Sequence, residues 1–283
     1  MSEHDASASR TGTLEVREVE KDYRLRAGLR FSTLHAVKGV SFTLEPGKTI
    51  ALVGESGSGK STIAKMLLKL ETPTRGEILL DGKPTGRRGK SLAAYRGDVQ
   101  MVFQDPFASL NPFHTIGHHI ERPIRIHHPE LSNDEVRARV LQLLERVRLS
   151  PAERFAERRP HELSGGQRQR VAIARALAPG ARFIIADEPV SMLDVSIRLG
   201  VLNLLAELQR EEQLGVLYIT HDLATARHFS DEILVLYRGE VVERGASDEV
   251  ILNPQHAYTK RLLDAAADPD RLGQLRDEVR SEA

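Results

Sequence analysis

An eight-residue stretch in the first quarter of the chain could hold a phosphate group. Residues 54–61 read Gly-Glu-Ser-Gly-Ser-Gly-Lys-Ser and match the pattern G-x-x-x-x-G-K-[ST] in full. Glycines allow several backbone N–H groups to point at one anion, and the N-terminus of the helix expected after the loop adds partial positive charge. Lys60 can then reach the β- and γ-phosphates of a nucleotide, and the Ser61 hydroxyl can hold Mg²⁺. The candidate nucleotide-binding residues of this loop are Gly54, Glu55, Ser56, Gly57, Ser58, Gly59, Lys60, Ser61 and Thr62.

Two carboxylates follow a second apolar run, Phe183–Ala186. Carboxylates at the end of a buried strand are costly unless they face a cation or water. In nucleotide hydrolases with a phosphate-binding loop, an aspartate at this point holds Mg²⁺, which gives Asp187 that role. Glu188 could accept a proton from the attacking water or orient it. A solvated strand end is the alternative explanation, and the presence of residues 54–61 favours the functional one.

Three further segments carry less specific signals. Leu163–Gln167 reads Leu-Ser-Gly-Gly-Gln before an expected helix, which suits either a helix-capping turn or a second anion site. Gln104 follows the apolar run Val99–Phe103 and is either a polar strand end or a neutral Mg²⁺ ligand. For His221 and Tyr23, each near the end of an expected strand, a structural role is the commoner one.

The elements expected around these residues alternate between strand and helix. Short apolar runs predict buried strands at 49–53, 99–103, 183–186, 216–219 and 233–236. Helical spacing predicts helices at 61–70, 167–178, 195–208, 223–229, 247–252 and 258–266, and Ser132 with Glu135 forms a capping-box pattern before another. Residues 83–98 are expected to be loop. The pattern indicates an α/β fold with a mostly parallel sheet and a helical insertion at about 105–180.

Composition narrows the class of protein. Hydrophobic residues make up 40% of the 283 residues, and 40 basic side chains balance 40 acidic ones, so charge gives no general attraction to nucleic acid. The absence of cysteine excludes disulfides and cysteine-ligated metal sites. No apolar run approaches the roughly 20 residues that span a bilayer, and the polar start lacks a secretory signal. A role at a membrane would therefore require docking on other chains.

In this order, the phosphate-binding loop, the Leu-Ser-Gly-Gly-Gln segment and the Asp-Glu pair resemble the ATP-binding cassette (ABC) family. The resemblance covers roughly residues 14–266 and implies a P-loop ATPase core with an antiparallel β subdomain and a helical subdomain. Residues 1–13 are rich in Ser, Thr and acidic groups and are expected to be a mobile tail. The resemblance implies domain limits of 14–245 for the ATPase domain and 246–283 for a C-terminal helical extension. ATP and Mg²⁺ are the implied cofactors, and ATP hydrolysis is the implied activity.

Carried over by position, the resemblance implies a role for each candidate. Glu188 would be the catalytic carboxylate, with His221, Lys60 and Gln104 acting at the γ-phosphate. Tyr23 would stack on adenine, and Ser61, Gln104 and Asp187 would surround the metal. Asp194 belongs to the segment linking two such sites, in which Met192 replaces a usually small residue. The signature residues that would contact ATP held by an opposite subunit are Ser164, Gly165, Gly166 and Gln167.

Finer features resemble the dipeptide and oligopeptide importer branch of this family, namely the segments 103–112 and 253–260. The resemblance implies a peripheral subunit on the cytoplasmic face of the membrane. Its partners would be a second, related but different ATPase subunit, two transmembrane permease subunits and, indirectly, a solute-binding protein. The alternatives are an importer for another solute such as nickel, or a subunit of a soluble complex such as phosphonate carbon–phosphorus lyase. Chromosome-associated and translation-associated ABC proteins fit poorly, because the chain has one uninterrupted cassette.

Overall fold

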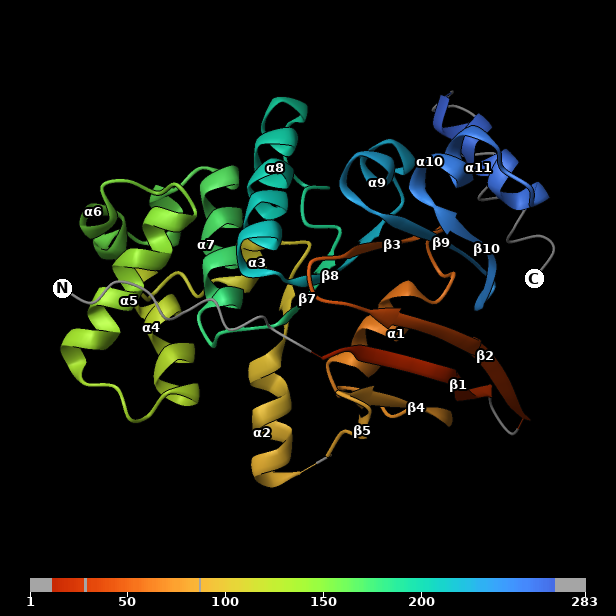
Figure 1. The fold of residues 1–283 in the computed structure, drawn as a ribbon, viewed down its shortest axis with the longest axis horizontal. Helices are drawn as coiled ribbons and strands as arrows, with labels where there is room; N and C mark the ends of the chain where they lie inside the picture. Colours follow the sequence, from red (N-terminus) through yellow and green to blue (C-terminus); the bar gives the residue numbers. More distant parts are fainter. Residues whose placement is uncertain (1–11, 28–29, 87, 268–283) are drawn as a thin grey trace. The chain divides into compact units, whose positions relative to one another are not determined.

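A computed structural model describes residues 12–27, 30–86 and 88–267 (Figure 1). The chain forms two compact units, of which one contains residues 85–215 and the other contains residues 12–84 together with 216–267. Most of the expected N-terminal tail and the last part of the C-terminal extension lie outside the described residues. Within the described ranges, none of the helices combines the length and the apolar character required to cross a lipid bilayer.

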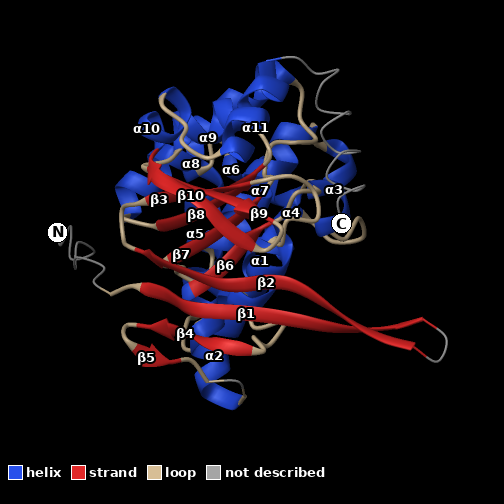
Figure 2. Ribbon diagram, turned by 90° about the vertical axis from the view of Figure 1, so that its right-hand side faces the viewer, coloured by secondary structure: helices blue, strands red, loops and turns tan. Residues whose placement is uncertain are grey.

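The unit formed by residues 12–84 and 216–267 contains an antiparallel sheet with the strand order β2-β1-β4-β5. Its strands are β1 (Leu14–Ala27), β2 (Arg30–Leu44), β4 (Arg75–Leu80) and β5 (Lys83–Pro84). Alternate residues such as Leu14, Val16 and Phe42 are buried, as expected for a sheet with one covered face. Figure 2 shows β1 and β2 running on as a two-stranded arm past the other strands.

The same unit holds the strand that leads into the phosphate-binding loop. β3 (Thr49–Val53) pairs in parallel with β8 (Gly215–Thr220) and β9 (Glu232–Tyr237), and β10 (Glu240–Ala246) pairs antiparallel with β9. All five residues of β3 are buried, which explains its uninterrupted apolar run. The helices of this unit are α1 (Lys60–Leu67), α9 (Leu223–Phe229), α10 (Ser247–Leu252) and α11 (Ala257–Ala267).

The other unit carries two parallel strands, β6 (Val99–Val102) and β7 (Phe183–Asp187), with helices around them. Ser132 and Glu135 form the expected capping box at the start of α5. The helices of this unit are α2 (Gly89–Asp98), α3 (Pro106–Ser109), α4 (Ile116–His127), α5 (Asn133–Arg146), α6 (Ala152–Glu157), α7 (Gly165–Leu177) and α8 (Val195–Glu212), with a short 3₁₀ turn at Pro160–Glu162.

The expected fold class is confirmed: parallel strands, an antiparallel sheet and a helical region are all present. The expectation of a loop at residues 83–98 is wrong, because Gly89–Asp98 forms α2 and residues 83–84 form β5. Only Tyr95 is buried in α2, so the helix has no apolar face that would reveal it in the sequence.

Candidate functional site

The phosphate-binding loop connects β3 to α1, as the sequence predicts. Lys60 is the first residue of α1 and is 93% buried, with 7% relative exposure. Its ammonium group donates to the carbonyl oxygens of Gly54, at 2.6 Å, and Glu55, at 2.8 Å. The lysine therefore lies inside the curve of its own loop and holds the backbone there.

Two glycines of the loop occupy positions where a side chain would not fit. A Cβ atom on Gly54 would lie 2.2 Å from the carbonyl oxygen of Leu236. A Cβ atom on Gly59 would lie 2.5 Å from the carbonyl oxygen of Ala36, and Gly59 also has a φ of +114°. Both positions meet backbone rather than a flexible side chain, so they require glycine.

The residues present fit a bound nucleotide phosphate. The hydroxyl of Ser58 is buried and has no hydrogen-bond partner within the described part of the chain. A buried hydroxyl usually has a partner, so this one is suited to a ligand oxygen. Lys60 supplies positive charge in the same loop, and the N-terminus of α1 adds its dipole.

His221 and Tyr23 belong to the same unit as the loop. Thr220, the last residue of β8, is paired with Val53, the last residue of β3. His221 therefore follows the strand next to the one that leads into Gly54. Tyr23 lies on β1 opposite Leu34 of β2, with the ammonium group of Lys21 5.0 Å from its ring centroid.

In the other unit, the acidic strand end has the geometry of a strained site. Asp187 is the last residue of β7, and Glu188 follows with a φ of +44°, which is unusual for a residue with a side chain. The side-chain amide of Gln104 donates to a carboxylate oxygen of Glu188 at 3.0 Å. The structure thus brings together two candidates that are 84 positions apart in the sequence. Backbone strain of this kind concentrates at functional sites.

The Leu-Ser-Gly-Gly-Gln segment begins α7 with a capping box. Ser164 Oγ accepts from the amide of Gln167 at 3.3 Å, and the Gln167 side chain accepts from the amide of Ser164 at 3.0 Å. A Cβ atom on Gly166 would lie 2.5 Å from Ile197 Cγ2 on α8, so close helix packing uses that glycine. The capping explanation thus describes the local geometry. Asp194 directly precedes α8, and Met192 beside it is exposed.

The ligand chemistry of Mg²⁺ can be compared with the oxygen donors among the candidate residues. The described residues contain no group of three histidine, cysteine or acidic side chains that could hold a metal ion. Mg²⁺ usually takes one or two protein oxygen ligands and completes its shell with water and substrate phosphates. Ser61 in one unit carries a hydroxyl and Asp187 in the other carries a carboxylate, and both groups are oxygen donors of that kind.

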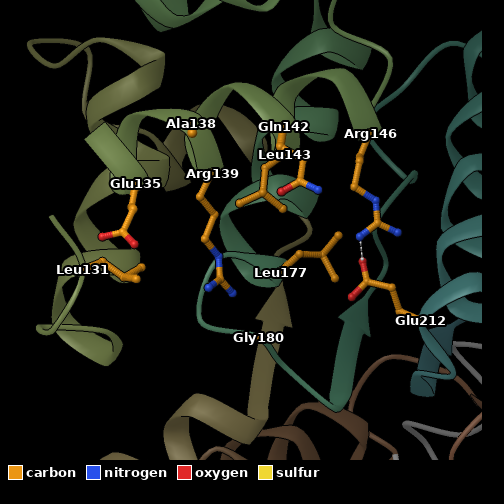
Figure 3. A pocket seen from close by; sticks show the side chains of 10 residues that line it. All are labelled: Leu131, Glu135, Ala138, Arg139, Gln142, Leu143, Arg146, Leu177, Gly180 and Glu212. Atoms are coloured by element: carbon orange, nitrogen blue, oxygen red, sulfur yellow. Dashed lines mark ion pairs between the residues drawn. The ribbon is translucent and has the colours of Figure 1, made fainter. Parts of the chain in front are cut away.

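One pocket of about 620 Å³ lies elsewhere, between α5 and the ends of α7 and α8 (Figure 3). Arg146 forms an ion pair with Glu212 across it, at 2.6 Å. None of the predicted site residues lines this pocket, so it is separate from the candidate site.

Comparison with known protein families shows the family to which the chain belongs. Residues 37–191 match the family described as ABC transporter. The chain belongs to the ABC transporter family. The matched segment contains the phosphate-binding loop, the signature and both carboxylates.

Curated relatives cover most of this ABC chain. The oligopeptide transport ATP-binding protein OppF of Escherichia coli K12 is 46% identical over 91% of the chain and 78% of its own length. The glutathione import ATP-binding protein GsiA of Salmonella choleraesuis is 47% identical over 95% of the chain, which spans only 44% of that relative.

Solved structures agree with the fold. A dimeric post-hydrolysis state of the ATP-binding cassette MJ0796, bound to ADP and Pi, is 34% identical with a TM-score of 0.71, and covers 83% of this chain and 98% of its own. CbiO1 of Clostridium perfringens, part of an ABC transporter complex, is 28% identical with a TM-score of 0.75 over 95% of this chain and 100% of its own. The chain is an ATP-binding ATPase subunit of this family.

Sequence reasoning missed two residues that contact the neighbourhood of the site. Gln169 on α7 is fully buried, and its amide donates to the carbonyl of Phe103, next to Gln104, at 3.4 Å. The hydroxyl of Tyr258 on α11 accepts from the amide of Glu55 at 3.1 Å. Each contact joins residues far apart in the sequence, so no local pattern could reveal either.

Proposed function

We propose that this ABC ATPase subunit powers the import of oligopeptides through transmembrane permease subunits. The observation that carries the proposal is the similarity to OppF, which extends over 91% of this chain and 78% of OppF. The similarity to GsiA, a glutathione import protein, points to the same chemical class, because glutathione is a small peptide.

We assign the nucleotide to residues 54–62, with Tyr23 against the base. Lys60 would hold phosphate oxygens, and Ser61, Gln104 and Asp187 would surround Mg²⁺, which neutralises phosphate charge when bound. Glu188 would orient the attacking water, and His221 would contact the γ-phosphate. The left-handed backbone of Glu188 and its hydrogen bond from Gln104 support this assignment, because both fix the carboxylate in one orientation.

The proposal includes the assembly. Two ATPase subunits, the second a related but different chain, would each present residues 164–167 and Asp194 to the other's nucleotide. They would lie against two permease subunits on the cytoplasmic face of the membrane, supplied by a solute-binding protein. The proposed limits are 14–245 for the ATPase domain, about 105–180 for its helical subdomain and 246–283 for the extension.

Uptake of labelled di- and oligopeptides in the native host tests this function. A chromosomal Glu188→Gln replacement keeps the size of the side chain but removes its capacity to take up a proton, so peptide uptake is expected to be lost. Glu157→Gln, at an exposed position on α6 in the same unit, is the matched control and should leave uptake intact.

Unchanged peptide uptake in a strain whose purified Glu188→Gln protein no longer hydrolyses ATP would contradict the peptide assignment. The same strain should then be tested with nickel and other solutes. Co-purification with soluble enzymes instead of integral membrane chains would favour the alternative of a soluble complex such as phosphonate carbon–phosphorus lyase.

A further inference from the structure

The C-terminal helix α11 reaches the phosphate-binding loop through a single side chain. Tyr258 is 1% exposed, and its hydroxyl oxygen lies 3.1 Å from the backbone nitrogen of Glu55. Because an amide nitrogen carries a hydrogen and has no free lone pair, the tyrosine oxygen is the acceptor. The contact joins residues 203 positions apart.

The peptide unit that receives this contact is also the one that holds Lys60. A trans peptide points its N–H and C=O groups in opposite directions. The Glu55 N–H meets Tyr258, and the Gly54 C=O of the same peptide accepts from the ammonium of Lys60 at 2.6 Å. The peptide is therefore held from both sides, and hydrogen bonds arranged in series strengthen each other.

The Gly54–Glu55 peptide needs a restraint from outside the loop, because glycine itself restricts the backbone very little. Without a Cβ atom, Gly54 tolerates many backbone conformations, so the peptide after it can rotate more easily than most. A rotation of that peptide would turn the Gly54 carbonyl away from Lys60. The hydrogen bond to Tyr258 opposes such a rotation, since the Glu55 amide would lose its partner in a buried place.

The surroundings of Tyr258 fix the position of its hydroxyl. Its ring packs on Tyr237 at the end of β9, with 4.2 Å between ring centroids. The segment before α11 is fastened by the Glu243 carboxylate, which accepts from the amides of Gln255 at 2.6 Å and His256 at 3.0 Å. His256 Nδ1 in turn accepts from the Tyr258 amide at 3.1 Å.

We propose that Tyr258 is a positioning residue for ATP binding, because it holds the Gly54–Glu55 peptide in the orientation that places Lys60. The segment from residue 253 to residue 267 thereby contributes to the nucleotide site. The inference rests on the proposed assignment of residues 54–62 to the nucleotide. Tyr258 acts through the Gly54–Glu55 peptide and Lys60.

Tyr258→Phe tests the proposal, because it removes only the hydroxyl and leaves the ring packing in place. Tyr237→Phe is the matched control: it removes a hydroxyl from the adjacent ring, for which the described part of the chain shows no hydrogen bond. In the full-length protein, Tyr258→Phe should raise the Kd for ATP about three- to tenfold, the range for one lost hydrogen bond. The KM for ATP should rise by a similar factor while kcat changes little, and Tyr237→Phe should match the wild type in both.

Hydrogen–deuterium exchange without nucleotide gives a readout that does not depend on ATP. The amide of Glu55 should exchange about three- to tenfold faster in Tyr258→Phe, with no change in Tyr237→Phe. Equal exchange and equal Kd in wild type and Tyr258→Phe would overturn the inference. A wild-type protein that binds no ATP would defeat the proposed function instead, and the exchange rates would still decide the role of Tyr258.

Glu243→Gln provides a second variant should Tyr258→Phe fold poorly. It weakens the anchoring of Gln255 and His256 from β10, so it should shift the Kd for ATP and the Glu55 exchange rate in the same direction by a smaller factor. No shift in either quantity would show that the segment before α11 does not position the loop.

Discussion

Three glycines share a positive φ angle but differ in how closely other atoms approach them, so alanine substitutions at these sites can measure how tightly the phosphate-binding loop is packed. Gly59 has a φ of +114°, and an added Cβ atom would lie 2.5 Å from the Ala36 carbonyl oxygen. Gly57 has a φ of +86° with no atom within 4 Å of an added Cβ. Gly82, in the turn between β4 and β5, has a φ of +69° and is equally open. Alanine at Gly57 or Gly82 therefore adds backbone strain alone, whereas alanine at Gly59 adds strain and a steric clash.

The expected losses follow from these surroundings. Gly57→Ala and Gly82→Ala should each lower the free energy of unfolding by about 1–2 kcal/mol, the cost of a left-handed backbone with a side chain. Gly59→Ala carries the same strain and adds about 1–3 kcal/mol for overpacking against a carbonyl that cannot turn aside, which gives about 2–5 kcal/mol in all.

Urea unfolding without nucleotide measures these differences as shifts of the midpoint at constant slope. Titration of the same three variants with ATP then distinguishes an effect on nucleotide binding from an effect on stability alone. Gly82→Ala should keep the wild-type Kd, whereas Gly57→Ala and Gly59→Ala should weaken ATP binding, because both change the loop itself. If Gly59→Ala proves no less stable than Gly57→Ala, the close approach of Gly59 to Ala36 is refuted.

Four other replacements give independent checks. Glu188→Gln should keep ATP binding while hydrolysis, measured by phosphate release, falls by orders of magnitude; near-normal turnover would remove Glu188 from its role. Lys60→Ala should weaken ATP binding itself in a direct titration, and normal affinity would contradict the loop assignment. Burial raises the pKa of Glu243, but hydrogen bonds from the Gln255 and His256 amides outweigh it and hold that pKa below its ordinary value of 4.5. The stabilisation that wild type has over Glu243→Gln should therefore be complete above pH 4.5 and shrink as the pH falls through the lower folded pKa, as followed by urea unfolding. Gln169→Leu should change the free energy of unfolding by less than about 1 kcal/mol. It removes the weak hydrogen bond to the Phe103 carbonyl, but it also removes a buried amide oxygen that has no partner among the described residues. Its turnover should fall, because the carbonyl next to Gln104 loses its donor.

Elements with a strong apolar pattern could be predicted from the sequence nearly to the residue. The strand Thr49–Val53 and the helices Leu223–Phe229 and Ser247–Leu252 have the bounds that their patterns predict. Residues 89–98 could not be predicted in this way, since one buried tyrosine does not make an apolar face. The long arm of β1 and β2 is similarly hidden, because its outer part pairs only with itself and carries exposed side chains such as Phe31.

The phosphate-binding loop was predictable because its chemistry lies within eight consecutive residues. The contact of Gln104 with Glu188 could not be predicted from the residues themselves, since each taken alone is an ordinary polar strand end, and the family resemblance alone assigned both to the γ-phosphate. The strained backbone of Glu188 also has no sequence signal, because glutamate rarely adopts a positive φ. Long-range contacts of this kind depend on how the strands are ordered in the sheet.

The two hydrogen bonds on the Gly54–Glu55 peptide differ in what ATP binding would do to them. In the nucleotide-free structure Lys60 donates to the Gly54 carbonyl. On the proposed function, Lys60 shares its three N–H donors between a phosphate and the loop, so its bond to the carbonyl weakens at the moment when the loop must keep its shape. Tyr258 is 1% exposed and its ring packs on Tyr237, so its hydroxyl is held beside the Glu55 amide by packing that a phosphate does not change. The bond from Glu55 to Tyr258 is then the one that keeps this peptide oriented through the nucleotide cycle. Its loss in Tyr258→Phe should therefore weaken ATP binding more than it weakens the folded protein.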